Sequence, residues 1–345
     1  MAAGERPLEG RVAVVAGATR GAGRGIAVML GAAGAVVYCT GRSTRERPSP
    51  MDRPETIEET AELVAAQGGQ AIAVRVDHTI EAEVVALFDQ VRAEQGRLDI
   101  LVNDVWGGDP MVDWSARFWS LDMGVARALI DQAIFSHMLT ARHGAAMMVP
   151  EGRGLIVEVT DGTFAGYRGH LVYDLVKSSV IRLAYAMAWD LVGTGVTALA
   201  VSPGFLRSEA VLGHFGVTEA NWRDGIAQDP FFAQSETPFL VGRGIAALAA
   251  DPEVGRKAGL ALFSGDLARD YGFSDVDGRN PDFHSLFDRT VDAMIDQQGD
   301  LDPEQQFLAW ARYLQLHREP AERARAERLG RRLGLESEGR GLQPS

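Results

Sequence analysis

Short apolar runs alternate along this chain with longer segments in which apolar residues recur at helical spacing. This alternation is typical of βαβ units, which build a parallel sheet covered by helices. We expect strands near residues 11–16, 35–40, 70–76, 98–103, 153–160, 196–202 and 258–264. The pattern therefore predicts an α/β fold with a doubly wound, parallel, seven-stranded sheet of the Rossmann-like kind.

The segments between these runs carry apolar residues three and four positions apart. In residues 22–33, Ile26 and Leu30 lie on one face, and Gly34 follows as the expected end of the helix. Further helices are expected at residues 55–67, 80–95, 120–148 and 171–192. Right-handed crossovers between parallel strands would place these helices on both faces of the sheet.

Residues 204–238 depart from this rhythm, because they form a long connection after a strand. Connections at this end of the strands often carry substrate lids in α/β enzymes, so we expect a mobile substrate loop here. The connection is rich in aromatic residues: Phe205, Phe215, Trp222, Phe231 and Phe232.

The same pattern predicts how the chain divides. A catalytic domain is expected at residues 8–265, a C-terminal helical extension at 266–335 and a disordered tail at 336–345. The extension ends in arginines interleaved with Glu and Ala, which is typical of a solvated helix. Its preceding helical stretch has an apolar face that carries Phe307, Trp310 and Leu314.

Composition narrows the class of partner. The chain has 345 residues, 46% of them hydrophobic, and a formal net charge of −13. A binding surface for nucleic acid needs clustered Lys and Arg, so this charge argues against one and favours a small-molecule substrate. We expect no metal site.

The single cysteine and the N-terminal segment indicate the compartment. Cys39 lies in an apolar run and has no cysteine to pair with, so it is expected to be a small buried side chain. The first residues lack the apolar core of a signal peptide, and no apolar stretch approaches a membrane span. We therefore expect a cytoplasmic protein that does not enter a membrane.

The first expected strand runs into a glycine-rich turn and then a helix. Gly17, Gly21 and Gly23 punctuate this turn, with Thr19 between the first two. Glycines at such a bend let the backbone approach a pyrophosphate, whose charge is stabilised by the helix N-terminus. The turn predicts a dinucleotide site; an ordinary tight turn without a ligand is the alternative.

The second expected strand indicates which dinucleotide is bound. NAD-binding sites of this kind carry an acid about 20 residues after the glycines, which binds the ribose 2′-hydroxyl. Here the strand ends in Thr40-Gly41-Arg42 without an acid. Arg42, with Arg20 in the glycine turn, could instead clamp a 2′-phosphate, so NADP(H) is favoured over NAD(H). Solvated arginines are the alternative.

Tyr173 and Lys177 lie four residues apart in an expected helix and therefore share a face. A free phenol has a pKa of about 10, and a neighbouring ammonium group favours the phenolate. Tyr173 is therefore a candidate to exchange a proton with a carbonyl or alcohol oxygen. Lys177 could also hold the cofactor's ribose.

Together these motifs resemble the short-chain dehydrogenase/reductase family over residues 8–265. The resemblance implies that Asp77 lies against adenine and that Asn103 belongs to the family's Asn-Asn-Ala-Gly strand end. The tail and the stretches Trp106-Gly107-Gly108 and Tyr173-Asp174 are most similar to the branch typified by dehydrogenase/reductase SDR family member 1, which does not fix a substrate. The family's loop near the nicotinamide is matched by Pro203, Gly204 and Ser208.

One position departs from the family pattern. Asp161 stands where the family has a serine that donates a hydrogen bond to the substrate, and an ionised carboxylate only accepts. In one interpretation, Thr160 or Thr163 supplies the hydroxyl instead. Alternatively, Asp161 is protonated or binds a cationic or polyhydroxylated substrate, or the site has lost activity. Its charge beside Tyr173 would raise the phenol pKa.

Two histidines are weaker candidates for the site. The family's helix asparagine, part of its proton relay, has no clear counterpart near residues 133–137, where His137 could stand in. His170 precedes Tyr173 by three residues and could face the cleft. Alternatively, neither histidine belongs to the site: His137 is packed or lies on the surface, and His170 lies at the start of the helix.

Aromatic residues after the expected strand ends indicate a pocket for a bulky, partly apolar carbonyl compound or alcohol. They also suit an ordinary core. The family resemblance implies a homodimer or homotetramer, assembled through the helices at 120–148 and 171–192. The expected pocket residues are Trp106, Phe164, Tyr167 and Phe205, with Trp114 near them.

Three functions remain open. An NADP(H)-dependent oxidoreductase that interconverts a carbonyl and an alcohol comes first. A non-catalytic NADP(H)-binding sensor or interaction protein is the alternative, because the serine position reads Asp161. An isomerase or dehydratase that uses transient hydride transfer ranks last, since its usual relatives have differently spaced glycine turns.

Overall fold

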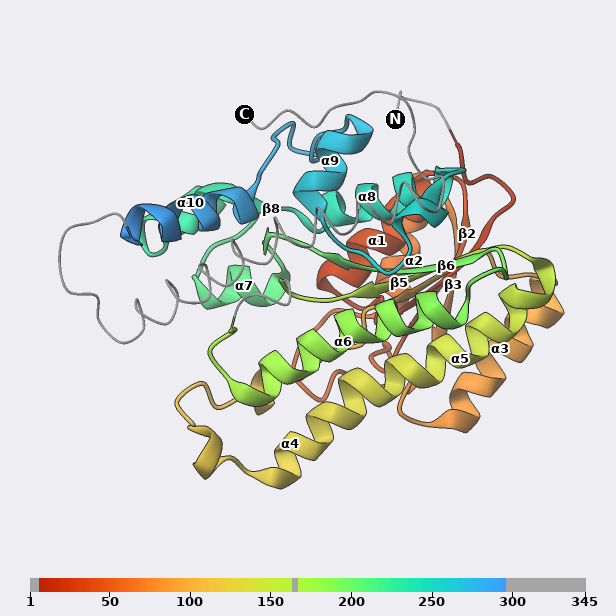
Figure 1. The fold of residues 1–345 in the computed structure, drawn as a ribbon, viewed down its shortest axis with the longest axis horizontal. Helices are drawn as coiled ribbons and strands as arrows, with labels where there is room; N and C mark the ends of the chain where they lie inside the picture. The colour runs from red at the N-terminus through yellow and green to blue at the C-terminus, as the bar shows by residue number, and fades with distance from the viewer. Residues whose placement is uncertain (1–5, 163–166, 296–345) are drawn as a thin grey trace, which may run out of the picture. The chain divides into compact units, whose positions relative to one another are not determined.

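The protein forms a seven-stranded parallel sheet, seen in a computed structural model that describes residues 6–162 and 167–295 (Figure 1). The strand order is β3-β2-β1-β4-β5-β6-β9, so the chain winds in both directions from β1. This confirms the expected doubly wound, Rossmann-like fold. The strands are β1 (Val12–Ala16), β2 (Val36–Gly41), β3 (Gln70–Arg75), β4 (Ile100–Asn103), β5 (Gly154–Val159), β6 (Val196–Ser202) and β9 (Ala261–Phe263).

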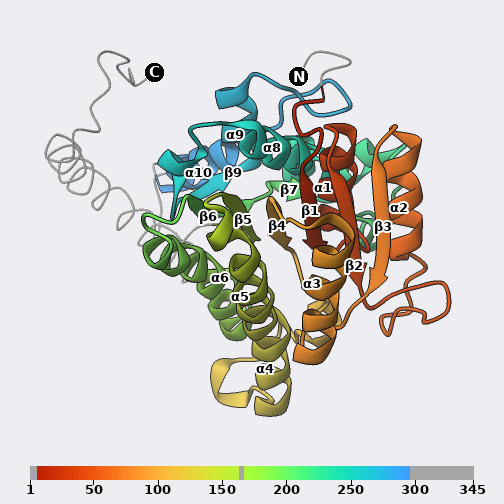
Figure 2. The same ribbon diagram turned by 90° about the vertical axis from the view of Figure 1, so that its right-hand side faces the viewer.

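Helices cover both faces of the sheet (Figure 2). The first face carries α1 (Gly21–Ala32), α2 (Ile57–Ala66), α8 (Pro238–Ala250) and α9 (Ser264–Tyr271). The second face carries α3 (Glu81–Gln95), α5 (Ser136–Met148) and α6 (Leu171–Asp190). On the first face α1 packs against both α2 and α8.

The central strands are buried on both faces, which explains their continuous apolar sequence. Side chains alternate along β1: Ala13 and Val15 pack in the core beneath α1 and α8, whereas Val12 and Val14 pack in the core beneath α3 and α5. The sheet reverses its winding between β1 and β4. Open α/β sheets bind ligands at the carboxyl ends of their strands beside such a reversal.

The helix expected at residues 120–148 begins later and has an irregular turn. Its first part is α4 (Met123–Ile130), followed by a π-helical turn at Asp131–Phe135 and then α5. Asp122 sets the start, because its carboxylate accepts hydrogen bonds from the backbone of Gly124 and Val125, at 2.7 and 3.1 Å.

The expected end of α1 is also refined. The helix closes at Ala33, and Gly34 follows it with a φ of +108°. A residue with a side chain rarely adopts this conformation, so glycine suits the position just past the helix end.

The connection at residues 204–238 is more structured than its sequence indicated. It contains β7 (Phe205–Leu206), α7 (Glu209–His214) and β8 (Ser235–Glu236), and β7 pairs with β8 in a second, parallel sheet. Short 3-10 helices are found here and elsewhere in the described chain, at Asp109–Met111, Phe118–Ser120, Val149–Glu151, Trp222–Ala227, Pro230–Gln234 and Val254–Lys257.

Helix α8 has no counterpart among the expected helices, although its start carries a sequence signal. Thr237 caps the helix by accepting a hydrogen bond from the backbone of Phe239, and Pro238 occupies the first turn. Proline suits this position because its missing N–H would have no partner there.

Arg207 fixes the base of this connection from a fully buried position. Its guanidinium donates to Glu219 at 2.7 Å, to Asp277 at 3.0 Å and to the Ser235 carbonyl at 2.9 Å. It also lies 4.3 Å from the ring centroid of Trp222. Buried charges need such partners, so Arg207 joins the two ends of the connection into one unit.

The chain divides into two compact units, residues 1–286 and 287–345. Helix α10 (Phe283–Ile295) begins in the first, and residues 287–295 are the described part of the second. The expected helix with Phe307, Trp310 and Leu314, the arginine-rich end and the tail at 336–345 lie outside the described residues. Within residues 6–162 and 167–295, no helix is long and apolar enough to cross a membrane.

Candidate active site

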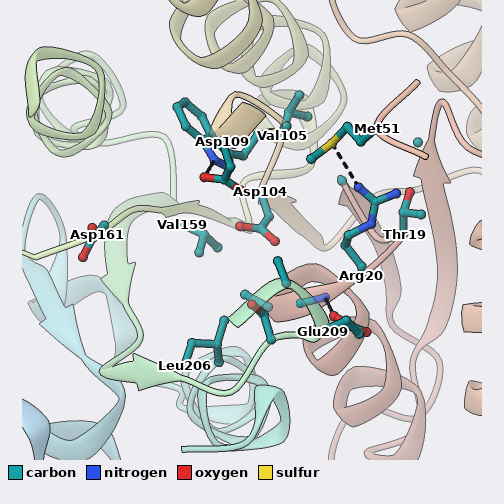
Figure 3. A pocket seen from close by; sticks show the side chains of 18 of the residues that line it. Thr19, Arg20, Met51, Asp104, Val105, Asp109, Val159, Asp161, Leu206 and Glu209 are labelled. Carbon is teal, nitrogen blue, oxygen red and sulfur yellow. Dashed lines mark hydrogen bonds between the residues drawn. The ribbon is translucent and has the colours of Figure 1, made fainter. Parts of the chain in front are cut away.

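A cavity of about 710 Å³ opens at the carboxyl ends of the central strands. The glycine turn before α1 forms one side of the cavity, and the segment after β5 forms the opposite side. Arg20 on the first side and Asp161 on the second lie at opposite ends of the cavity (Figure 3). The expected site residues that line it are Gly17, Thr19, Arg20, Gly21, Arg42, Asp77, Trp106, Thr160, Asp161, Tyr173, Lys177, Pro203, Gly204, Phe205 and Ser208.

The glycine turn is shaped by close backbone packing. Gly17 has a φ of +89°, and a Cβ there would lie 2.3 Å from the Asp104 carbonyl oxygen. A Cβ on Gly23 would lie 2.3 Å from the Gly17 carbonyl oxygen. Gly23 does not line the cavity, so its contribution is to let α1 start close against β1.

Basic and hydroxyl side chains gather at the end of the cavity beside β2. Arg20, Arg42, Arg53, Ser43 and Ser49 all line it, and the Arg20 guanidinium donates to the Ser49 hydroxyl at 3.0 Å. This is a donor set suited to a phosphate group. The sequence pattern did not indicate Arg53 and Ser49 as site residues, because residues 43–56 show no regular periodicity.

Carboxylates accompany these arginines. The Arg20 Nε lies 3.3 Å from Glu55, and Arg42 lies 3.8 Å from Asp77. Burial lowers the pKa of Arg20, and the Glu55 charge opposes that shift. Although burial acts in the other direction, hydrogen bonds from Thr79 lower the pKa of Asp77. These carboxylates partly neutralise the cluster of arginines.

Asn103 does not reach the cavity, in contrast to its expected place among the cofactor-binding residues. Its side chain is fully buried and donates to the Glu158 carboxylate at 2.7 Å and to the His137 carbonyl at 3.3 Å. His137 is buried too, with Nδ1 2.6 Å from Glu158 and Nε2 3.0 Å from the Val105 carbonyl. These residues brace the strand ends behind the cavity.

Tyr173 and Lys177 project from the first turns of α6 into the cavity. The helix begins at His170, whose ring nitrogen accepts a hydrogen bond from the Tyr173 backbone at 3.3 Å. His170 is therefore a helix cap and does not line the cavity. The Lys177 ammonium lies 4.4 Å from the centroid of the Trp106 ring, and burial lowers its pKa.

The Tyr173 hydroxyl donates a hydrogen bond to the Asp161 carboxylate at 2.8 Å. Burial raises the pKa of Tyr173, and the charge of Asp161 and this hydrogen bond raise it further. Asp161 thus holds Tyr173 as a neutral phenol. The direction of this shift agrees with the charge argument made from the sequence.

The alternative hydroxyl donors are only partly described. The Thr160 hydroxyl donates to the Lys177 carbonyl at 2.8 Å, so its proton is engaged with the backbone of α6. Thr163 lies outside the described residues, as does the expected pocket residue Phe164. In the described part of the site, the polar group hydrogen-bonded to the phenol is the Asp161 carboxylate.

Asp104 is a further carboxyl in the cavity wall. It follows Asn103 at the end of β4, beneath the glycine turn (Figure 3). Burial raises its pKa to about 7, although the charge of Lys177 opposes the shift. The sequence motif contains Asp104, but only the fold shows that it lines the site.

Glu236 lies behind the loop of Pro203 and Gly204. Its Oε2 accepts hydrogen bonds from the Gly204 backbone at 3.0 Å and from the Ser264 hydroxyl at 2.6 Å. Its Oε1 has no hydrogen-bond partner in the described part of the chain. Burial raises the pKa of Glu236 to about 7. A glutamate from β8 therefore holds the loop in place.

Aromatic rings surround the end of the cavity that holds Tyr173. The ring centroids of Trp106 and Trp114 lie 5.4 and 5.2 Å from that of Tyr173. Phe205 also lines the cavity, and its centroid lies 5.8 Å from that of Phe283. Tyr167 does not line the cavity and is 45% exposed, in contrast to the expected pocket position.

Comparisons with known proteins agree with this geometry. A family model described as short chain dehydrogenase matches residues 11–213. Dehydrogenase/reductase SDR family member 1 of Mus musculus is 36% identical over 286 residues, which cover 81% of this chain and 88% of that protein. The 7alpha-hydroxysteroid dehydrogenase of Escherichia coli (strain K12) is 27% identical over 205 residues, covering 59% of this chain and 74% of that protein.

One solved structure with a fold similar to that of this chain contains a nucleotide. It is a candidate NAD(P)-dependent gluconate 5-dehydrogenase from Beutenbergia cavernae, with bound NADP at low occupancy. The TM-score is 0.59 at 25% identity, over 74% of this chain and 96% of that chain.

The chain therefore belongs to the short-chain dehydrogenase/reductase family, a family of oxidoreductases that bind NAD or NADP. Within it, the chain groups with the branch typified by dehydrogenase/reductase SDR family member 1. Both the family and the branch expected from the motifs are confirmed. In the described residues, no group of three or more His, Cys, Asp or Glu side chains is placed to hold a metal ion.

Proposed function

We propose that this protein is an NADP(H)-dependent oxidoreductase that interconverts a carbonyl and an alcohol on a bulky, partly apolar small molecule. The observation that carries the proposal is the layout of one cavity. Arg20, Arg42 and Arg53 line one end, and Tyr173 and Lys177 line the other. The first end suits the phosphate of a 2′-phosphorylated ribose and the second suits proton exchange with a reacting oxygen.

The residues present fit the dinucleotide. Donors for the phosphates come from the glycine turn, from the N-terminus of α1 and from the arginines beside β2, where no acid follows Thr40 to bind a free 2′-hydroxyl. Lys177 would hold the ribose near Tyr173, with Pro203, Gly204 and Ser208 beside the nicotinamide. When bound, the cofactor supplies or accepts the hydride.

The proton moves through Tyr173 and Asp161. In alcohol oxidation, the substrate hydroxyl gives its proton to the Tyr173 oxygen while the Tyr173 proton passes to the Asp161 carboxylate. In carbonyl reduction both transfers reverse, so the new alcohol takes its proton from Tyr173. This route needs no phenolate, which is consistent with the raised pKa of Tyr173.

The aromatic walls support a bulky, partly apolar substrate, because Trp106, Trp114 and Phe205 supply ring surface beside Tyr173. We place the protein in the cytoplasm as a homodimer or homotetramer. Supporting an assembly through α6, Trp189 is 65% exposed and Tyr185 and Leu175 are also exposed. Sedimentation velocity would measure the assembly, and a monomer at micromolar concentration would contradict it.

The test is a change in nicotinamide absorbance when NADPH is mixed with a panel of cyclic and aromatic ketones, and NADP+ with the matching alcohols. Turnover should be stronger than with NADH or NAD+. Tyr173→Phe should abolish it while NADPH binding persists. Turnover that survives Tyr173→Phe would remove Tyr173 from the assigned role.

One observation favours a second function. The Tyr173 hydroxyl is already bonded to Asp161, and a phenol with a raised pKa is a weaker acid. The chain would then bind NADP(H) as a sensor or interaction protein without turnover. Tight NADPH binding with no turnover on the panel, and unchanged binding in Lys177→Ala, would support this function over the enzyme; binding by Tyr173→Phe is expected for both functions.

A further inference from the structure

Glu209 places a carboxylate on the N-terminus of α1, inside the proposed cofactor site. It lies in the first turn of α7, and its Oε2 accepts a hydrogen bond from the Gly21 backbone at 2.8 Å (Figure 3). The two residues are 188 positions apart in the chain. The N–H groups at the start of a helix are the groups that bind a pyrophosphate in dinucleotide sites.

The surroundings of Glu209 are basic. Its Oε1 lies 3.6 Å from the Arg24 guanidinium, and its charge also acts on Arg20 and Arg53. Its side chain is 27% exposed and lines the cavity. The nearby acids Glu55 and Glu59 pair with these arginines, whereas Glu209 is bonded to the first N–H of α1, at Gly21, and Asp104 to the backbone of Gly23.

The start of α7 lies in van der Waals range of Gly21. A Cβ built there would lie 3.6 Å from the Ser208 Cβ, and the Gly21 φ is +56°. Ser208 caps α7 by accepting a hydrogen bond from the Val211 backbone at 3.3 Å. The start of α7 therefore rests directly on the start of α1.

We propose that Glu209 is a determinant of cofactor affinity: its carboxylate occupies the anion-binding N-terminus of α1 until the cofactor's pyrophosphate displaces it. A carboxylate and a pyrophosphate cannot share this helix end without charge repulsion. Displacement moves the start of α7, a short helix whose residues Ala210, Val211 and His214 line the same cavity. Cofactor binding thereby reshapes the substrate side of the site. This inference rests on the proposed function.

The test compares two ligands by titration calorimetry. NADP+ carries a pyrophosphate, whereas 2′-AMP carries the 2′-phosphate without one. In Glu209→Gln and Glu209→Ala, the Kd for NADP+ should fall about fivefold or more, because a carboxylate no longer competes for the helix end. The Kd for 2′-AMP should fall clearly less than the Kd for NADP+, because 2′-AMP carries no pyrophosphate that competes with the carboxylate for the helix end.

Asp224→Asn is the matched control, because it removes the same charge from the same connection at an exposed position outside the cavity. It should leave both affinities unchanged. Two results in the folded Glu209 variants would overturn the role of Glu209 alone. One is an equal fall in the Kd for NADP+ and for 2′-AMP. The other is a Kd for NADP+ that is unchanged or higher in both variants. No NADP+ or NAD+ binding by the wild type and both variants would overturn the proposed function as well.

Discussion

The Tyr173 hydroxyl donates to the Asp161 carboxylate at 2.8 Å, so the two side chains form one hydrogen-bonded pair. In the family pattern this position holds a serine, which donates a hydrogen bond to the substrate. Here the carboxylate accepts, and it raises the pKa of the phenol. Chemistry at the cavity should therefore depend on Asp161 as strongly as on Tyr173.

Replacing Asp161 tests this dependence. Asp161→Asn keeps the size of the side chain but removes the carboxylate that accepts the Tyr173 proton. We expect the kcat for alcohol oxidation to fall about a hundredfold or more, the usual contribution of a positioned acid or base. The Kd for NADP+ should not change. Equal kcat in the two proteins would show that the proton leaves Tyr173 by another route.

Asp161→Ser should instead change the pH profile. Removing the carboxylate lowers the Tyr173 pKa towards that of a free phenol, but the phenol must then ionise before it accepts a proton. Oxidation by the serine variant should rise with pH into the alkaline range, whereas the wild type changes less above neutrality. Initial rates across that range measure this, and identical profiles would contradict it.

Arg42 and Arg53 should set the preference for NADPH. Each lines the end of the cavity beside β2, and a 2′-phosphate there gains a charge-assisted hydrogen bond from each. Arg42→Ala and Arg53→Ala should each raise the Kd for NADPH about tenfold, at 1.4 kcal/mol per factor of ten, and leave NADH binding nearly unchanged. Arg92→Ala, an exposed arginine on α3, is the control. A parallel loss of NADH and NADPH would argue against 2′-phosphate recognition.

Arg207 should contribute strongly to stability. It is fully buried, and its removal takes away the guanidinium that donates to Glu219. The Ser235 carbonyl and Asp277 then keep only their hydrogen bonds from Arg279, and Trp222 loses one of the guanidinium groups packed on its ring. Arg207→Ala should lower the free energy of unfolding by about 3 kcal/mol in urea titrations. Arg256→Ala, which breaks an exposed pair with Glu253, should cost less than about 1 kcal/mol. Similar losses in the two variants would contradict the importance of this cluster.

Glu236 should make stability depend on pH. Its pKa rises from 4.5 to about 7 in the folded protein, so the protonated form contributes stability that is fully present below about 4.5 and lost as pH rises to about 7. The difference corresponds to about 3 kcal/mol. Between about pH 5 and 8, Glu236→Gln should therefore lose less stability than the wild type. Glu253→Gln, an exposed control, should follow the wild type.

Much of the fold follows from local sequence patterns. The seven strands were predicted because each is a short apolar run, and the glycine turn because strand, glycines and helix are contiguous. Tyr173 and Lys177 were expected on the same face of a helix because they are four residues apart. The charge of Asp161 beside Tyr173 was also anticipated, since both residues could be aligned to the family motifs.

The rest of the site depends on contacts between distant segments. Glu209 meets Gly21 across 188 positions, and Arg53 reaches the cavity from a segment without periodicity. Asn103 was assigned to the cofactor from its motif, yet its side chain turns towards His137 and Glu158 in the core. Burial of this kind is set by tertiary packing, which a local motif does not specify.

The anchoring of residues 204–238 has a consequence for engineering. Arg207, Glu219 and Trp222 lock the base of this connection, while α7 contacts α1 through the Glu209 carboxylate. In this connection, the residues around Arg207 hold the fold together, whereas the residues of α7 line the cavity. A library confined to residues 210–214 would diversify the mouth of the cavity on an intact frame, so new substrate preferences should be accessible without compensating mutations elsewhere.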